Sequence, residues 1–148
     1  MRTQFCIIGA GPSGLLLSQL LHRKGIESVV LERKTKDYVL GRIRAGVLEH
    51  GFAELMREAG VGDRMDREGY IHDGTVIAYD NHQFRVDFAA RANASVIVYG
   101  QTELTRDLYA AREAADGKIT YKREAVRMQH ADGDAPYVEV NVGGQGPR

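Results

Sequence analysis

The chain has 148 residues, of which 43% are apolar and 27% charged, and this composition excludes a disordered or fibrous protein and fits one domain. Twenty basic and twenty acidic side chains cancel, so a global field that attracts nucleic acid or an anionic membrane is excluded. The single cysteine, Cys6, excludes an internal disulfide and a multi-cysteine metal site and indicates a cytoplasmic protein.

A glycine-rich turn follows the first apolar run of the chain. Gly9, Gly11 and Gly14 have the G-x-G-x-x-G spacing. Residues 3–8 predict a buried strand before this turn, and residues 28–31 predict a second strand after an intervening helix. That helix is predicted from an apolar face of five leucines and a stop at Gly25, the leucines being Leu15, Leu16, Leu17, Leu20 and Leu21.

The turn and the residue after the second strand together predict a dinucleotide site. The three glycines allow a tight turn, a close approach of backbone to pyrophosphate and close packing of helix on strand. The N–H groups of a helix opening at Pro12 and Ser13 would face the phosphates, and Glu32 is placed to accept hydrogen bonds from an adenosine ribose. A glycine-rich structural turn that binds nothing is the alternative.

A basic segment follows Glu32 and concentrates positive charge in a chain that is neutral as a whole. It holds five of the twenty basic residues, namely Arg33, Lys34, Lys36, Arg42 and Arg44. Arginine pairs bidentately with phosphate and carboxylate, so the arginines in GRIRAG favour a binding role. For Lys34 and Lys36 a solvated surface is the stronger interpretation.

The remaining chain predicts an α/β fold with a small antiparallel β insertion. We expect a helix over residues 46–59 closed by Gly60, a polar connection over 62–69, and short strands at 70–72, 76–79, 84–88 and 94–99. Asp73-Gly74 and residues 80–82 are the predicted turns. A helix over residues 100–115 capped by Thr102, a strand at 118–121 and a hairpin of 125–129 with 137–142 complete the order. The predicted parts are 1–60, 70–99 and 100–148.

Three segments of the sequence carry a family resemblance. GAGPSGLLLSQLL, LERKTKDYVLGRIRAGVLEHG and VYGQTELTRDL resemble the N-terminal part of the 4-hydroxybenzoate 3-monooxygenase family of FAD-dependent aromatic hydroxylases. The resemblance implies a Rossmann-like FAD-binding βαβ fold. It also implies that Gly9, Gly11, Ser13 and Gly14 bind the FAD pyrophosphate, that Glu32 and Arg33 lie at the adenosine side, and that the flavin contacts Arg42, Ile43, Arg44, Ala45, Gly46, Val47 and Gln101.

The chemistry implied by the resemblance is hydroxylation of 4-hydroxybenzoate to 3,4-dihydroxybenzoate with dioxygen, FAD and NADPH. Arg44 resembles the arginine beside the mobile flavin ring, and His72 resembles a histidine at the solvent end of a proton path. An ordinary surface histidine is the alternative for His72. Arg33, Lys34 and Tyr38 would select NADPH, but Lys34 departs from the family pattern, which leaves NADH as the alternative. No metal site is predicted, because the histidines share no ligand spacing.

Two later cofactor motifs of the family and its substrate-binding residues have no match in this sequence. We therefore expect an incomplete domain without the substrate domain, inactive alone. A homodimer is a candidate assembly of the complete enzyme, and the sequence leaves the oligomeric state open. A related hydroxylase of another phenolic acid and a dinucleotide-binding module without catalysis are the alternatives. An NAD-dependent dehydrogenase ranks lower, because GRIRAG has no obvious place in its sugar site.

Overall fold

The computed structural model describes residues 1–142, and within them the chain divides into two compact units. The first unit combines residues 1–42 with the chain from Leu108 onward, and the second unit comprises residues 43–107. No helix within the described range is long and apolar enough to cross a lipid bilayer.

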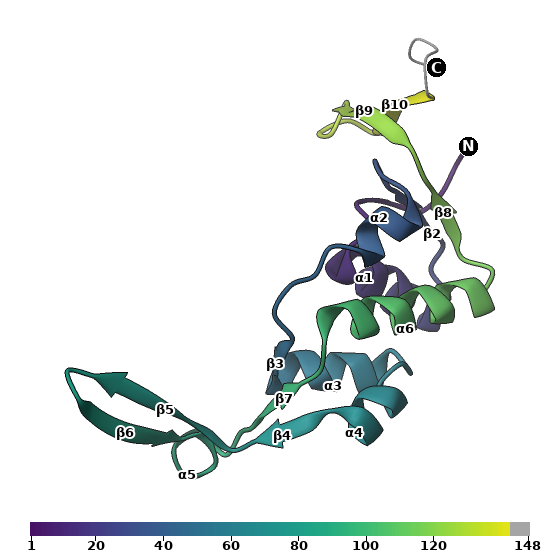
Figure 1. Ribbon diagram of the computed structural model, residues 1–148. Coiled ribbons are helices and arrows are strands. Elements are labelled where there is room, and N and C mark those ends of the chain that lie inside the picture. The colour runs from purple at the N-terminus through teal and green to yellow at the C-terminus, as the bar shows by residue number, and fades with distance from the viewer. Residues whose placement is uncertain (143–148) are drawn as a thin grey trace. The chain divides into compact units, whose positions relative to one another are not determined.

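The first unit contains a three-stranded parallel sheet. Its order is β1 (Phe5–Ile8), β2 (Ser28–Leu31) and β8 (Lys118–Thr120), of which Figure 1 labels β2 and β8. The helix α1 (Pro12–Arg23) connects the first two strands and lies against both of them. Phe5 pairs with Ser28 and Val29 with Lys118, so the predicted βαβ arrangement is confirmed and extended by a third strand.

The bounds of α1 follow from local chemistry. Pro12 occupies the first helical position, where a missing N–H removes no hydrogen bond. Gly25 follows the helix with a φ of 71°, a left-handed conformation that glycine adopts without strain. Leu15 and Leu16 are buried as predicted, whereas Leu17 is 46% exposed. The buried face is therefore narrower than the run of leucines indicates.

The prediction that the first strand is buried is wrong. Ile7 is buried, but Phe5 is 47% and Ile8 59% exposed. β1 lies at the edge of the sheet, and alternate side chains of a strand point to opposite faces. The face that carries Cys6 and Ile8 has no covering layer among the described residues.

Two further elements of the first unit lie outside its parallel sheet. The short helix α2 (Lys36–Leu40), which was not predicted, begins after Thr35, whose hydroxyl accepts a hydrogen bond from the Tyr38 N–H at 3.2 Å. The predicted C-terminal hairpin is present as β9 (Arg123–Gln129) and β10 (Tyr137–Val142).

The second unit contains a three-stranded antiparallel sheet in the order β3 (Val47–Glu49), β7 (Val96–Val98) and β4 (Tyr70–His72). The helices α3 (His50–Glu58) and α4 (Asp63–Glu68) accompany it. The helix predicted over 46–59 therefore begins too early, because residues 47–49 pair with β7. The polar connection predicted over 62–69 is wrong, because α4 occupies most of it.

The strands β5 (Gly74–Tyr79) and β6 (His82–Asp87) form a separate two-stranded ribbon (Figure 1). Asp80 and Asn81 both have positive φ, as the predicted tight turn requires. The turn predicted at Asp73-Gly74 is wrong, because Gly74 begins β5 and β4 pairs with β7 instead of β5. The short helix α5 (Phe88–Ala92), capped by the Asp87 carboxylate, follows.

The helix α6 (Gln101–Ala114) begins in the second unit and ends in the first. Thr102 is its second residue, so the predicted cap is wrong. The Leu104, Leu108 and Tyr109 side chains are at most 1% exposed. The Tyr109 hydroxyl donates to the Ala10 carbonyl oxygen at 3.1 Å, which ties the helix to the glycine turn.

Replacement of this hydroxyl tests its contribution to the fold. Tyr109→Phe should lower the free energy of unfolding by about 1 kcal/mol, because the buried Ala10 carbonyl loses its donor. Urea unfolding of the 148-residue chain measures the change. The matched control is Tyr137→Phe on the half-exposed strand β10, which should shift stability by less than about 0.5 kcal/mol. Equal stabilities of the two variants would contradict the assigned role.

Candidate functional site

The glycine turn closes tightly between β1 and α1. Gly9 has a φ of 110° and donates its N–H to the Leu31 carbonyl oxygen at 2.7 Å. A Cβ atom added to Gly14 would lie 2.1 Å from the Gly9 carbonyl oxygen. A side chain at position 14 would therefore push the helix away from the turn.

Gly11, by contrast, faces open space. A Cβ atom added there would meet nothing within 4 Å, and the first turn of α1 has no capping side chain. The free N–H groups and the positive end of the helix dipole therefore remain available to an anionic group. The backbone at Gly11 and Ser13 therefore has the open space and the free donors that the predicted diphosphate contact requires.

Glu32 is held at the end of β2 by two backbone donors. Its Oε2 accepts from the Ala10 N–H at 2.8 Å and its Oε1 from the Lys34 N–H at 2.7 Å. An ionised carboxylate offers about four lone-pair positions, so acceptor capacity remains on both oxygens. The half-buried carboxylate is oriented by the turn and can still accept bonds from ribose hydroxyls.

Two of the basic residues that follow Glu32, Lys34 and Arg42, lie beside the aromatic ring of Tyr38. Arg42 Nη1 donates to the Tyr38 hydroxyl at 3.1 Å, and Lys34 Nζ lies 5.4 Å from the Tyr38 ring centroid. The hydrogen bond and the charge of Arg42 lower the pKa of Tyr38. Arg33 is exposed beside them. The cluster is a cationic surface with one planar side chain.

The second unit holds the rest of the GRIRAG segment. The Gly46 carbonyl oxygen accepts from the Tyr99 N–H at 2.7 Å, and a Cβ atom added to Gly46 would lie 2.5 Å from the Tyr99 carbonyl oxygen. This close approach brings the segment next to Gly100 and hence to the start of α6 at Gln101. The neighbouring predicted residues are exposed, and they are Ile43, Arg44, Ala45 and Val47.

A charged network that the sequence analysis missed holds the start of α6 in the second unit. Arg64 bonds Glu103 at 2.6 Å and Asp107 at 3.1 Å, and the Tyr99 hydroxyl donates to Asp107 at 2.5 Å. Burial, followed by the neighbouring Asp107, raises the pKa of Tyr99. The partners are distant in sequence, so no local pattern could have revealed them. The network positions the helix that carries Gln101.

His72 lies away from the other predicted residues of the second unit. It is exposed at the end of β4 and pairs with Val96, whereas Val47 and Tyr70 pair with Val98. The register therefore places His72 at the opposite end of the small sheet from Gly46. Its neighbour Asp73 accepts a hydrogen bond from Arg85 at 2.5 Å.

Comparison with known proteins assigns the chain to a family. The sequence profile of a family described as "FAD binding domain" matches residues 2–148, and the chain belongs to this family. The family match supports FAD as the cofactor of the class to which the chain belongs, and the assignment of the glycine turn to that cofactor stays a prediction.

One curated relative is similar over nearly the whole chain. The p-hydroxybenzoate hydroxylase of Acinetobacter baylyi is 43% identical over 145 residues, which are 97% of this chain and 36% of that protein. The family resemblance found in the sequence is confirmed by this similarity. The chain spans about a third of the length of that relative.

Two solved structures share the fold. The anhydrotetracycline hydroxylase OxyS of Streptomyces rimosus has a TM-score of 0.78 at 24% identity, covering 100% of this chain and 30% of its own. The p-nitrophenol 4-monooxygenase PnpA of Pseudomonas putida has a TM-score of 0.77 at 19% identity, covering 92% of this chain and 35% of its own. The predicted α/β fold class is confirmed.

The contrast between Gly11 and Gly14 provides a test of the turn. Gly14→Ala should lower the free energy of unfolding by about 2 to 4 kcal/mol, because its Cβ meets backbone that cannot yield without moving α1. Gly11→Ala is the matched control, and it should stay within about 1 kcal/mol of the parent because the added methyl group enters open space. Urea unfolding compares the two variants. Equal losses would contradict the close approach at Gly14.

Proposed function

We propose that this chain forms the FAD-binding portion of an aromatic monooxygenase that hydroxylates 4-hydroxybenzoate to 3,4-dihydroxybenzoate. The observation that carries the proposal is the 43% identity, over 97% of the chain, to a p-hydroxybenzoate hydroxylase. Bound FAD would supply the redox and oxygen chemistry, and the protein would bind, orient and shield it. The single cysteine supports the proposed cytoplasmic setting. We also propose a homodimer as the assembly of the complete enzyme.

The first unit would hold the adenosine side of FAD. Gly9, Gly11, Ser13 and Gly14 would carry the diphosphate at the start of α1, and Glu32 would accept hydrogen bonds from the ribose. The open space at Gly11 and the fixed carboxylate of Glu32 support this assignment. Arg33 would lie at the outer side of the same site.

The GRIRAG segment and the start of α6 would hold the flavin side. The close approach of Gly46 to Tyr99 supports this proposal, since it places one segment beside the other in the second unit. Arg44 would orient the flavin, because its planar guanidinium can donate paired hydrogen bonds to one anionic or carbonyl group. His72 would exchange protons with solvent, consistent with its exposure. The proposed flavin contacts are Arg42, Ile43, Arg44, Ala45, Gly46, Val47 and Gln101.

The cationic cluster around Tyr38 would select NADPH over NADH. A ribose 2′-phosphate carries negative charge that Arg33 and Lys34 would neutralise, and the Tyr38 ring offers a planar surface. The positions of Lys34 and Arg42 around this ring support the proposal. An aromatic acid and dioxygen would be the other partners of the complete enzyme.

Titration of the chain with FAD, followed by flavin fluorescence, tests the cofactor proposal. Saturable binding is expected, and Glu32→Ala should weaken it by about tenfold or more, because both the turn and the ribose lose their acceptor. Glu124→Ala on the exposed edge of β9 is the matched control and should bind as the parent does. Preference for NAD, or no binding by a chain whose circular dichroism shows it folded, would contradict the proposal.

The coenzyme proposal is tested in the complete enzyme. Lys34→Gln should raise KM for NADPH about three- to tenfold and leave KM for NADH unchanged, because only NADPH carries the 2′-phosphate. Lys36→Gln removes the same charge from a residue that pairs with Glu113, and it should leave both constants unchanged. Equal effects on the two coenzymes would exclude this role of Lys34.

A further inference from the structure

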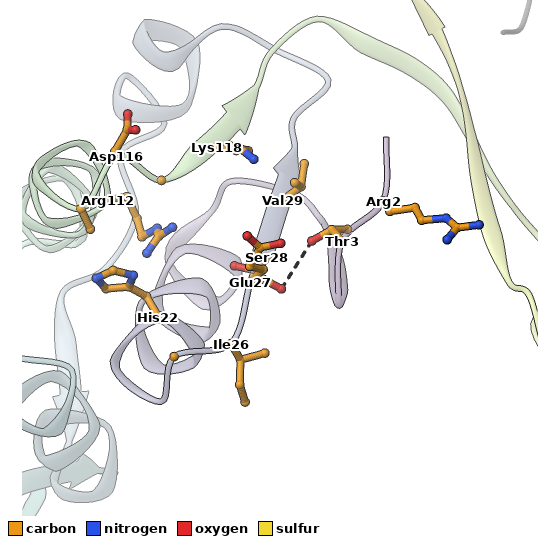
Figure 2. Close-up of a pocket in the computed structure, with 13 residues that line it drawn as sticks. Arg2, Thr3, His22, Ile26, Glu27, Ser28, Val29, Arg112, Asp116 and Lys118 are labelled. Carbon is orange, nitrogen blue, oxygen red and sulfur yellow. Dashed lines mark hydrogen bonds between the residues drawn. The ribbon is translucent and has the colours of Figure 1, made fainter.

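A hollow of about 280 Å³ lies in the first unit, at the amino ends of β2 and β8. The C-terminal ends of α1 and α6 form two of its walls, and the N-terminal segment forms another (Figure 2). Thr3 Oγ1 fixes that segment by donating to the Glu27 carbonyl oxygen at 3.4 Å. The glycine turn follows the carboxyl end of β1, so the hollow lies at the opposite end of the parallel sheet.

Arg112 is the unusual group of this hollow. Its side chain points from α6 towards the space between His22 and Ser28 (Figure 2), and the residue is only 4% exposed. Its Nη1 donates to Gln19 Oε1 at 3.4 Å, and its buried Nε finds no partner within residues 1–142. A guanidinium has five N–H donors, and the buried Nε leaves one of them without an acceptor in the described part of the chain.

The Arg112 guanidinium has no counterion among the described residues 1–142, and a neighbouring glycine makes room for it. A Cβ atom added to Gly117 would lie 2.2 Å from Arg112 Nη2, so the absence of a side chain there makes room for the guanidinium. Glu27 and Asp116 line the hollow, but neither forms an ion pair with Arg112 in the described part of the chain. Burial lowers the pKa of Arg112. A buried cation without an anionic partner is costly, and the cost is recovered when an anion binds.

The remaining lining adds positive charge near Arg112. Lys118, at the start of β8, and His22, in the last turn of α1, are exposed on the rim. Arg2 also belongs to the lining, although its side chain points away from the others in Figure 2. Without the histidine, the lining holds the cationic Arg2, Arg112 and Lys118 against two acidic side chains. The buried guanidinium is the group best placed for bidentate recognition.

We propose that this hollow is a binding site for a small oxyanion, a phosphate monoester or a carboxylate, held by the Arg112 guanidinium and by Lys118. The site is separate from the proposed FAD site, because the two lie at opposite ends of the parallel strands. A ligand here would neutralise the buried charge and would join the ends of α1 and α6 to β8. Its binding does not depend on the proposed monooxygenase function.

Isothermal titration of the 148-residue chain with inorganic phosphate and, separately, with acetate tests the proposal. Chloride at matched ionic strength measures unspecific screening. One saturable site is expected for phosphate or acetate. The anion that binds with the higher affinity shows whether the site prefers a phosphate monoester or a carboxylate. Lys118→Gln should weaken that site about three- to tenfold, while Lys122→Gln, an equal charge change four residues further along, should leave it unchanged.

Arg112→Lys completes the experiment by keeping the charge and removing the planar fork. It should weaken binding about tenfold or more in a chain that circular dichroism shows to be folded. If that variant does not fold, the comparison of Lys118→Gln with Lys122→Gln decides alone. Absence of a saturable site in the folded parent, or equal weakening by the two lysine variants, would overturn the proposal and leave Arg112 to pair with another part of the polypeptide.

Discussion

The structure of the first unit depends on one carboxylate that joins two backbone segments. Glu32 directly follows β2, and its oxygens accept hydrogen bonds from the Ala10 N–H in the glycine turn and from the Lys34 N–H at the entry to the basic segment. These charge-assisted bonds are among the stronger polar contacts of a protein. They fix the turn and the next segment relative to the same strand, so the proposed diphosphate and ribose contacts share one rigid support.

A second constraint is the close approach of backbone to backbone, and it recurs in both units. Gly14 in the first unit and Gly46 in the second each leave no room for a side chain, because carbonyl oxygens lie where a Cβ would be. Each glycine therefore brings a proposed cofactor segment directly against its neighbour. Side-chain hydrogen bonds support both arrangements. In the first unit the Tyr109 hydroxyl donates to the Ala10 carbonyl oxygen of the glycine turn, and in the second unit Arg64 donates to Glu103 in α6.

The sequence predicted what depends on short-range patterns. The spacing of Gly9, Gly11 and Gly14 and the position of Glu32 were sufficient for the βαβ unit, and Asp80 and Asn81 for the hairpin turn. The strand at residues 47–49 was not predicted. These three residues open a helical pattern, and nothing local marks them as a strand until their partner strand is known. The Arg64 network and the burial of Arg112 were not predicted either, because both depend on contacts between residues far apart in the chain.

The order of the strands also affects how the protein can fold. β2 is complete at residue 31, but its neighbour β8 follows the whole second unit, and Val30 pairs with Ile119. Closing so long a loop costs conformational entropy and therefore slows the pairing of β2 with β8. The second unit is one continuous stretch of chain and forms without closing that loop. During synthesis the second unit can therefore gain structure before β8, the partner strand of β2, has been made. Completion of the parallel sheet is then a late step of folding.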